Sequence, residues 1–519
     1  MHRNALLVTA CLLPLSVWST AATPAPAGDV KQYSQLWGRE GENWSPAGRL
    51  PDFSFAGYHS GEDPLPVVPV TANVRDFGAK GDGEHDDTQA FKDAIARTSA
   101  GAILIPPGRY VITDILWIQK PNLVLRGAGA DRTTLVCPKP LEQIKPDSGA
   151  TTEGQPTSNY SWSGGIIWVR GSRETRHPRS VTTEARRGEN IIAVEDTAAL
   201  AVGQRVHLRL TDDDRHTLID HLYAGDPGDI TKLIERGAIK TGVVSRITAL
   251  DGHRVTLERP LPFDVRLAWS PTLSVFDPDV TEVGIESLGF EFPVTPYGGH
   301  FKEAGYNAIS INTAADCWVR DVCLRNADSG VFLGGTFCTL DGLVIESERP
   351  MNVTRQATGH HALELGVDCL AQNLDFRTHF IHDITVDRDD CRNVVKNGRG
   401  VNLSLDHHKR VPYANLFCNL DAGDGSELWH CGGGAALGKH CAAWGTFWNI
   451  RTARPVRSPD ARFGPGLMNF VGLHTDESTH TDPTGRWFEA IPPGELYPAD
   501  LHAAQLARRL ARKAKPSAQ

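Results

Sequence analysis

The sequence predicts an all-β protein whose short strands wind into a parallel solenoid, and three observations predict it. From about residue 275 onward, like residues recur roughly every 22 positions. Residues 73–129 form short strand-like runs separated by Gly- and Pro-containing turns. The composition, 40% hydrophobic and 22% charged with 50 Gly and 33 Pro in 519 residues, excludes a disordered, collagen-like or coiled-coil chain.

The repeat is visible as constant spacings between asparagines and between cysteines. Asn352, Asn373, Asn393 and Asn415 are 21, 20 and 22 residues apart, and Val or Leu follows each. Cysteines keep the same step at 317/338, 369/391 and 418/441. Because equivalent residues of neighbouring coils stack at about 4.8 Å, we expect Asn373, Asn393 and Asn415 on successive coils. We also expect the cysteines to be buried thiols that fill the coil interior.

The segment from Asn73 to Gly129 is the most diagnostic. Residues 73–83 indicate a strand and a Gly/Asp turn, and Gln89–Arg97 a helix with Asp87 or Thr88 as its N-cap. Two strands follow, broken by Pro-Gly and Gly-x-Gly. This segment resembles the opening of the pectate-lyase-like superfamily of right-handed parallel β-helices, in which the helix caps the first coil. The resemblance implies that fold but not one chemistry, since lyases, hydrolases and phage tail spikes share it.

The chain divides into six expected segments. They are a signal peptide (1–22), an extended N-terminal arm (23–72) whose aromatic residues pack on the body, the start of the β-helix with its capping helix (73–185), an inserted small β module (186–265), the main β-helix (266–460) and a C-terminal tail (461–519). The leader has a positive start, an apolar run and a small-residue cleavage site, which predicts a secreted or periplasmic protein. No later apolar run is long enough for a membrane helix, so membrane insertion is not expected.

The C-terminal tail carries a helical pattern between Asp500 and Lys515. Apolar residues recur at helical spacing, and basic residues fall on the other side. We expect an amphipathic helix with Asp500 near its N-cap and a solvated basic face. The apolar stripe expected to dock on the body is Ala503, Leu506, Ala507, Leu510, Ala511 and Ala514.

Histidines gather in one part of the repeat. Eight of the twenty lie between residues 351 and 440, together with several arginines and aspartates. In residues 382–387 and 401–408, aliphatic side chains alternate with polar ones, which predicts an outward polar wall. The candidate catalytic residues are His408, His382, Asp406, Asp383, Arg377, Arg399 and Arg410. The candidate substrate-binding residues are Lys409, His360, His361, His407, Trp429 and His430.

Such a wall suits an anionic polysaccharide lying across the coils. The net charge of −9 makes nucleic acid a poor partner. We expect a lyase that cleaves a uronic-acid-containing polysaccharide by β-elimination, with His408 or His382 as base and arginines holding the carboxylate. A glycoside hydrolase that pairs Asp383 with Asp406 is the alternative, and a non-catalytic glycan-binding β-helix is a third. If the wall is not the site, Tyr297, His300 and Glu303 are the next candidates.

The sequence leaves the metal requirement open. The family resemblance implies that Ca²⁺ could assist, with Asp383, Asp387 and Asp406 as oxygen ligands. No histidine spacing is convincing for zinc, because His360-His361 and His407-His408 are adjacent pairs and neighbouring strand residues point to opposite faces.

Overall fold

The computed structural model describes residues 31–172, 176–354 and 356–514. The expected signal peptide, residues 1–22, lies outside these residues. Within them, no helix combines the length and the apolar character that crossing a bilayer requires.

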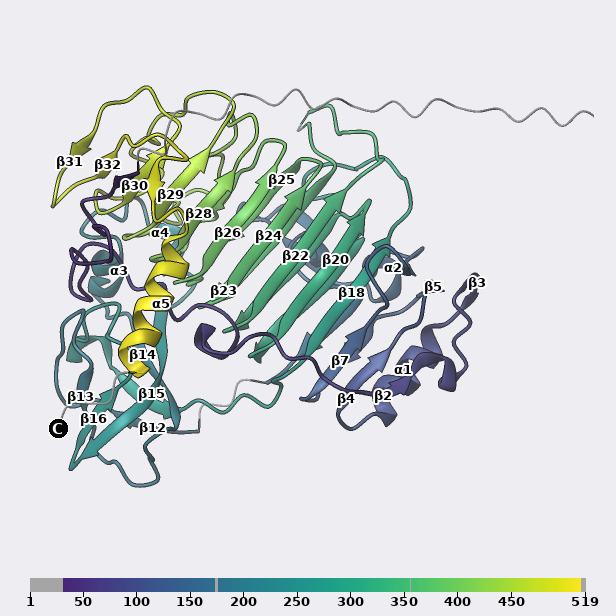
Figure 1. Ribbon diagram of the computed structural model, residues 1–519, viewed down its shortest axis with the longest axis horizontal. Helices are drawn as coiled ribbons and strands as arrows, with labels where there is room; N and C mark the ends of the chain where they lie inside the picture. Colours follow the sequence, from purple (N-terminus) through teal and green to yellow (C-terminus); the bar gives the residue numbers. More distant parts are fainter. Residues whose placement is uncertain (1–30, 173–175, 355, 515–519) are drawn as a thin grey trace, which may run out of the picture.

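The coils form two long sheets that share one core, and the predicted right-handed parallel β-helix is confirmed. Successive strands lie side by side through the centre of Figure 1. The seven-stranded sheet is parallel throughout. It contains β6 (Leu116–Ile118), β11 (Ile167–Arg170), β19 (Asn307–Ala315), β21 (Ser329–Thr336), β23 (Gly359–Val367), β25 (Phe380–Val386) and β27 (Leu405–His407).

The second sheet has sixteen strands and continues to Glu489, beyond the expected end of the β-helix at 460. Its strands are β2 (Val70–Asn73), β3 (Asp82–Asp86), β4 (Gly101–Leu104), β5 (Gly108–Val111), β7 (Leu123–Arg126), β8 (Thr133–Val136), β18 (Gly284–Glu291), β20 (Trp318–Arg325), β22 (Thr339–Glu346), β24 (Leu370–Phe376), β26 (Val394–Gly400), β28 (Leu416–Asp421), β29 (Thr446–Arg451), β30 (Asn469–Leu473), β31 (His480–Thr481) and β32 (Trp487–Glu489).

The core lies inside the coils and is built by stacking equivalent apolar residues. Ile309, Val331, Leu363, Ile384 and Leu405 occupy one register position on successive strands of the seven-stranded sheet. All five are buried. Because side chains alternate along a strand, the next position of each strand faces the other side of the sheet.

The asparagines form two ladders. The expected stacking of Asn373 with Asn393 and Asn415 is wrong, because Asn373 occupies a different register position. Asn393 stacks on Asn415, and their side chains hydrogen-bond at 3.1 Å. Asn373 belongs to a different ladder with Asn397, Asn419 and Asn449, where Asn419 donates to Asn397 at 2.8 Å. All four have φ between 51° and 58°, a left-handed conformation that asparagine tolerates. The coil length between Asn373 and Asn397 is 24 residues rather than 20.

The cysteine ladder continues into the asparagine ladder. One stack contains, on successive coils, Cys317, Cys338, Cys369 and Asn393, each directly before a strand residue that pairs with its neighbour. The Oδ1 atom of Asn393 accepts a hydrogen bond from the Cys369 amide at 2.9 Å. The nine cysteines of the described residues are all free thiols, and eight of them are buried. They pack as small apolar side chains.

A helix covers the first end of the β-helix. α1 (Thr88–Arg97) lies over the first coil, and its Phe91 packs on Tyr110. Asp87 occupies the expected N-cap position of α1, but its carboxylate accepts from the Lys80 and Gly81 amides and makes no capping bond. The Asp86 carboxylate accepts from the Thr88 amide instead.

The N-terminal arm and the C-terminal helix pack together on the sixteen-stranded sheet (Figure 1). Trp37 and Phe53 of the arm are buried there. α5 (Leu501–Ala514) begins after Asp500, whose carboxylate accepts from the Ala503 amide at 2.9 Å. The expected docking stripe of α5 was wrong: Leu501, His502 and Gln505 are buried, whereas its alanines at 503, 507, 511 and 514 are exposed. The basic face is not free either, since Arg509 and Lys513 pair with Glu62.

The inserted module is an antiparallel six-stranded sheet beside the coils. It spans residues 176–275, ten more at each end than the expected 186–265. Its strands are β12 (Arg176–Ser180), β13 (Ile191–Ala193), β14 (Arg205–Thr211), β15 (Lys240–Asp251), β16 (Arg254–Leu257) and β17 (Thr272–Val275), and α3 (Thr217–Leu222) and α4 (Thr231–Ile234) connect β14 to β15.

Small elements elsewhere are β1 (Gln32–Tyr33), paired with β33 (Leu496–Tyr497), the hairpin β9 (Ser148–Ala150) and β10 (Pro156–Ser158), and α2 (Leu141–Ile144).

Candidate active site

Six histidine rings gather at the last strands of the seven-stranded sheet. Four come from the coils: His360 and His361 on β23, His382 on β25, and His408 directly after β27. His300 enters from the connection before β19, and His430 from the connection before β29. Neighbouring ring centroids are 4.2 to 6.1 Å apart. We call this group the histidine cluster.

Asp406 lies beside the cluster and holds it in place. It occupies the register position of Thr385 and Glu364, next to the core position, and therefore faces outward. Its Oδ2 accepts from His408 Nδ1 at 2.8 Å and from the Thr385 hydroxyl at 3.2 Å, and its Oδ1 accepts from the Gly432 amide at 2.7 Å. His382 Nδ1 lies 3.2 Å from the same Oδ2.

The imidazoles of the cluster differ in protonation: one is protonated at neutral pH and others are neutral. Burial works against it, but the Asp406 carboxylate raises the pKa of His408 to about 9, so this ring holds a proton at neutral pH. Burial lowers the pKa of His382 well below its usual range and that of His361 to about 3. Although burial opposes it, His382 and His408 hold the pKa of Asp406 well below its ordinary value. A proton donor and proton acceptors therefore lie side by side.

A second group of charges borders His408. Arg410 Nε donates to Asp387 at 2.9 Å, and the Lys409 ammonium donates to the Gly434 carbonyl at 2.9 Å. Burial, together with the nearby Asp387 carboxylate, raises the pKa of Glu364 to about 8, so Glu364 is a neutral acid at neutral pH. Burial lowers the pKa of Lys409.

The structure brings together many, but not all, of the predicted site residues. His360, His361, His382, Asp406, His408 and His430 lie within the cluster, and Lys409 and Arg410 adjoin it. His300 and Glu303, the second choice from the sequence, belong to the same cluster: His300 is 4.7 Å from His360 between ring centroids, and Glu303 Oε1 is 3.3 Å from His360 Nδ1.

Three of the proposed catalytic residues do not reach the cluster. Arg377 and Arg399 lie on the sixteen-stranded sheet, where both pair with Asp375 at 2.9 Å. Asp383 is buried, and its carboxylate accepts from the Phe380 and Ser404 amides and lies 3.5 Å from His379. Asp383 is as buried as Asp406, and these bonds tie its carboxylate to its own coil and the next one rather than to the histidine cluster.

Two of the proposed substrate-binding residues pack against aromatic rings of the core instead. The His407 ring lies among Phe417, Phe447 and Phe463, and its Nδ1 is hydrogen-bonded to the Leu405 carbonyl. The Trp429 ring meets Phe447 edge-on, with centroids 4.9 Å apart. The His407 ring is fully buried, whereas Trp429 is partly buried at the edge of the core.

Glu364 was not among the residues predicted from the sequence. It lies between Leu363 and Leu365 in β23, and only the register that places it level with Thr385 and Asp406 reveals it. His300 and Glu303 lie in an irregular connection, where no period marks them.

The three aspartates expected to hold Ca²⁺ do not form an oxygen cage. Asp383 accepts backbone amides, Asp387 pairs with Arg410, and Asp406 accepts from His408. The side-chain groups of the described residues that could hold a cation include none with Asp383 or Asp387. Calcium prefers six to eight oxygen ligands, so these residues do not fit it together.

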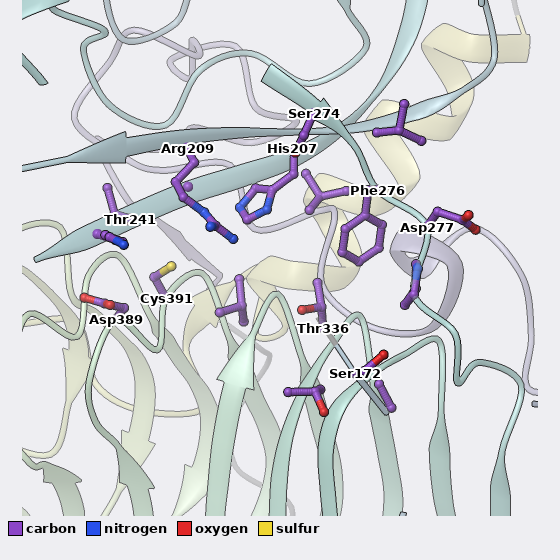
Figure 2. Close-up of a pocket in the computed structure, with 18 residues that line it drawn as sticks. Ser172, His207, Arg209, Thr241, Ser274, Phe276, Asp277, Thr336, Asp389 and Cys391 are labelled. Carbon is purple, nitrogen blue, oxygen red and sulfur yellow. The ribbon is translucent and has the colours of Figure 1, made fainter. Parts of the chain in front are cut away.

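A separate cavity of about 430 Å³ lies between the module and the coils. Figure 2 shows His207 and Arg209 of β14 facing Thr336, Asp389 and Cys391 of the coil turns. It lies at the carboxyl ends of β19, β21 and β23, which reach it through Thr313, Thr336 and Val367. No member of the histidine cluster lines it.

Comparison with known proteins gives one family match and several partial relatives. Residues 71–146 match a family model described as rhamnogalacturonase A/epimerase, pectate lyase-like. The plasmin and fibronectin-binding protein A of Streptococcus pneumoniae is 28% identical over 25% of this chain and 18% of its own length. Alginate lyase 7 and mannuronan C5-epimerase AlgE5 of Azotobacter vinelandii are each 32% identical over 18% of this chain, covering 12% and 10% of their own lengths. The chain therefore matches less than a fifth of each of these relatives.

Two solved structures that are similar to the chain are phage tailspikes. The gp54 tailspike of Acinetobacter baumannii bacteriophage AP22, solved with a capsular saccharide, is 9% identical over 78% of this chain and 58% of its own, with a TM-score of 0.45. The gp49 tailspike of Pseudomonas phage LKA1 is 13% identical over 73% and 63%, with a TM-score of 0.39. The match at residues 71–146 and the parallel coils described above confirm the resemblance to the pectate-lyase-like superfamily.

Proposed function

We propose that the protein cleaves a uronic-acid-containing polysaccharide by β-elimination at the histidine cluster. The observation that carries the proposal is the Asp406–His408 pair, joined at 2.8 Å on the outer side of the sheet and followed directly by Lys409 and Arg410. Two relatives carry the names alginate lyase and mannuronan C5-epimerase, and both names refer to polymers of uronic acids.

Of the two histidines predicted as base, His408 rather than His382 is the one that meets the substrate. Its side chain is 22% exposed, whereas that of His382 is 2% exposed. Because Nδ1 is bonded to Asp406, Nε2 is the atom that exchanges a proton with the sugar. Asp406 is a positioning residue that orients the ring.

The deprotonated ring of His408, whose share rises as pH approaches its pKa of about 9, takes up at Nε2 the proton on the carbon next to the sugar carboxylate. The C–H electron pair becomes a C=C bond, the glycosidic C–O bond breaks, and the departing oxygen takes up the proton from His408. A cation beside the carboxylate stabilises the charge that develops. Lys409 and Arg410 supply it, since Arg377 and Arg399 lie on the other sheet.

The test measures ultraviolet absorbance of an unsaturated product from alginate, polygalacturonate and neutral glycans. His408→Gln is expected to lose about 10²- to 10⁴-fold in kcat with an unchanged melting temperature, as is typical for loss of a proton-transfer group. Asp383→Asn is the matched control, because it should lower the melting temperature and leave kcat of the folded protein intact. Full activity in His408→Gln would disprove the assignment.

Glycoside hydrolysis is the second candidate, and one geometric observation favours it. Glu364 and Asp406 occupy the same register position two strands apart, a backbone separation of about 9.6 Å. Carboxyl groups of inverting hydrolases are about 6.5–9.5 Å apart, a range that these two side chains reach by leaning towards each other. Reducing ends without ultraviolet absorbance would support hydrolysis, inverted sugar configuration without chain cleavage would support epimerisation, and binding without turnover would support a glycan-binding protein.

We propose that the protein is exported, on the basis of the leader pattern at residues 1–22. Expression of the full chain in a bacterial host with separation of cytoplasm, periplasm and medium tests this. N-terminal sequencing should find a mature chain that begins near residue 23. An uncleaved chain in the cytoplasm would contradict export.

A further inference from the structure

We propose that His300, His360 and His382 form a binding site for a divalent transition-metal ion of the Zn²⁺ class. One ring nitrogen from each residue lies within 4.8 Å of the other two. Three nitrogens bound to a tetrahedral Zn²⁺ lie about 3.4 Å apart, from Zn–N distances of about 2.1 Å. A small rotation of the rings therefore completes the set. The site does not depend on the proposed elimination reaction.

Unpaired ring nitrogens are the main reason for this inference. His360 and His382 are 1% and 2% exposed, and none of their four ring nitrogens makes a hydrogen bond within the described part of the chain. Burying a polar atom without a partner costs about 1–3 kcal/mol. Two adjacent rings with this deficit need a ligand that satisfies them, and a metal ion satisfies one nitrogen of each.

Carboxylates lie beside the nitrogens that the metal would not use. Glu303 Oε1 is 3.3 Å from His360 Nδ1, and Asp406 Oδ2 is 3.2 Å from His382 Nδ1. Metal-binding histidines commonly direct their second nitrogen at a carboxylate, which fixes the ring and its tautomer. This arrangement leaves Nε2 of both rings for the metal. Tyr297 in turn donates to Glu303 Oε1 at 2.5 Å and holds that carboxylate.

Two other groups of the described residues come close to metal-site geometry, but their ligand atoms are already bonded. In His382–Asp406–His408, the carboxylate accepts from His408, Thr385 and the Gly432 amide. In His59–Glu282–Asp316, both ring nitrogens of His59 are bonded to carboxylates, and Asp316 pairs with Arg205. Imidazole donors favour Zn²⁺, Cu²⁺ or Ni²⁺ over Ca²⁺ and Mg²⁺, which prefer oxygen.

The sequence could not indicate this site. His360 and His382 are 22 residues apart, one coil length, and His300 lies 60 residues earlier in an irregular connection. No local spacing typical of zinc proteins is present, because stacking of coils, rather than a helix or a turn, brings the three rings together.

The experiment titrates the chelator-treated, desalted full chain with ZnCl₂ in a calorimeter, and separately records the visible absorption of bound Co²⁺. We expect saturation at one ion per chain and the ligand-field bands of low-coordinate Co²⁺. His360→Phe and His382→Phe should each weaken binding by more than about 100-fold, since loss of an outer-shell partner alone typically costs about 10- to 100-fold.

His502→Phe is the matched control. His502 is also buried with both ring nitrogens unpaired, but it lies on α5, far along the chain from the cluster. Its variant should bind Zn²⁺ like the unmodified chain. Absence of saturable Zn²⁺ binding by the unmodified chain would overturn the proposal whatever the variants do. So would full retention of binding by the double variant of His360 and His382.

The outcomes separate this inference from the proposed reaction, because the titration uses no polysaccharide. A chain that binds Zn²⁺ but never forms an unsaturated product would disprove the elimination alone. A chain that forms the product and binds no Zn²⁺ would disprove the metal site alone.

Discussion

Adjacent histidines at the end of β27 have opposite environments. His407 packs among phenylalanine rings in the coil interior, whereas His408 faces outward and bonds to Asp406. The reason is the alternation of side chains along a strand. The same alternation places Leu405 inside and Asp406 outside, so a single register decides which imidazole faces outward.

His407 should make the protein less stable in acid. Burial lowers its pKa to about 4, although the Leu405 carbonyl opposes this shift. The unfolded chain, with a pKa near 6.5, takes up a proton that the folded chain does not. Its contribution to stability is therefore complete above pH 6.5 and is lost as pH falls towards 4. Between pH 6.5 and 5 the loss is about 2 kcal/mol, at about 1.4 kcal/mol per pH unit.

His407→Phe should remove this part of the pH dependence. Urea unfolding at pH 7.5 and pH 5.0 should show a smaller difference for the variant than for the unmodified chain. The exposed His85 serves as a control, because His85→Gln should leave the difference unchanged. Equal differences in His407→Phe and the unmodified chain would show that His407 does not titrate in this range.

At the scale of elements, each coil of the sixteen-stranded sheet bends at a left-handed residue. Ser287, Asp321, Gly342, Asn373, Asn397, Asn419, Asn449 and Gly472 share this register position, and all have positive φ. Asparagine adds a side-chain hydrogen bond along the ladder. The coil period was predictable from the sequence. Which asparagines share a register position was not, because Asn393 and Asn397 are only four residues apart and either could have stacked on Asn373.

Asn419 provides a test of this bend. Asn419→Ala should cost about 1–2 kcal/mol for the left-handed backbone, in addition to the hydrogen bonds with Asn397 and Asn449. Asn419→Gly keeps the backbone freedom and loses only the hydrogen bonds. Chemical denaturation should therefore rank the glycine variant above the alanine variant. The reverse order would mean that backbone conformation does not limit this position.

The C-terminal helix docks through the buried Leu501 and through polar contacts of Gln505. Gln505 accepts from the Phe53 amide at 2.8 Å and donates to the Pro51 carbonyl at 2.8 Å, and it is 3% exposed. Gln505→Ala leaves a buried amide unpaired, which should lower stability by about 1–3 kcal/mol. Arg512→Ala, at an exposed position of the same helix, is the control. Equal melting temperatures for the two variants would contradict the polar docking.

At the scale of the whole molecule, the sequence predicted the solenoid better than the site. Strand alternation and coil period are local, so they placed Asp406 and His408 on the outer wall, where the structure has them. They could not place Arg377 and Arg399, because nothing local tells which of two sheets a strand joins. They also could not show that Tyr297, His300 and Glu303 converge on the same wall, since irregular connections have no period.

The inserted module is tied to the connection that completes the site. The Tyr223 hydroxyl donates to the Lys439 carbonyl at 3.0 Å and accepts from the Val411 amide at 3.1 Å. The Lys232 amide of α4 donates to the Ala436 carbonyl. The same connection, residues 431–440, delivers the Gly432 amide to Asp406 at 2.7 Å. The module therefore supports the orientation of Asp406 from a distance.

This coupling predicts that a change in the module alters catalysis. Tyr223→Phe removes both hydrogen bonds of the hydroxyl and frees the 431–440 connection to shift. A displacement of about 1 Å at a reacting group can cost up to about 100-fold in rate, so kcat on the preferred polysaccharide should fall well beyond the loss of folded protein. Tyr497→Phe, at a 42% exposed position, should leave kcat unchanged. If Tyr223→Phe lowers only the melting temperature, the module packs against the coils without positioning the site.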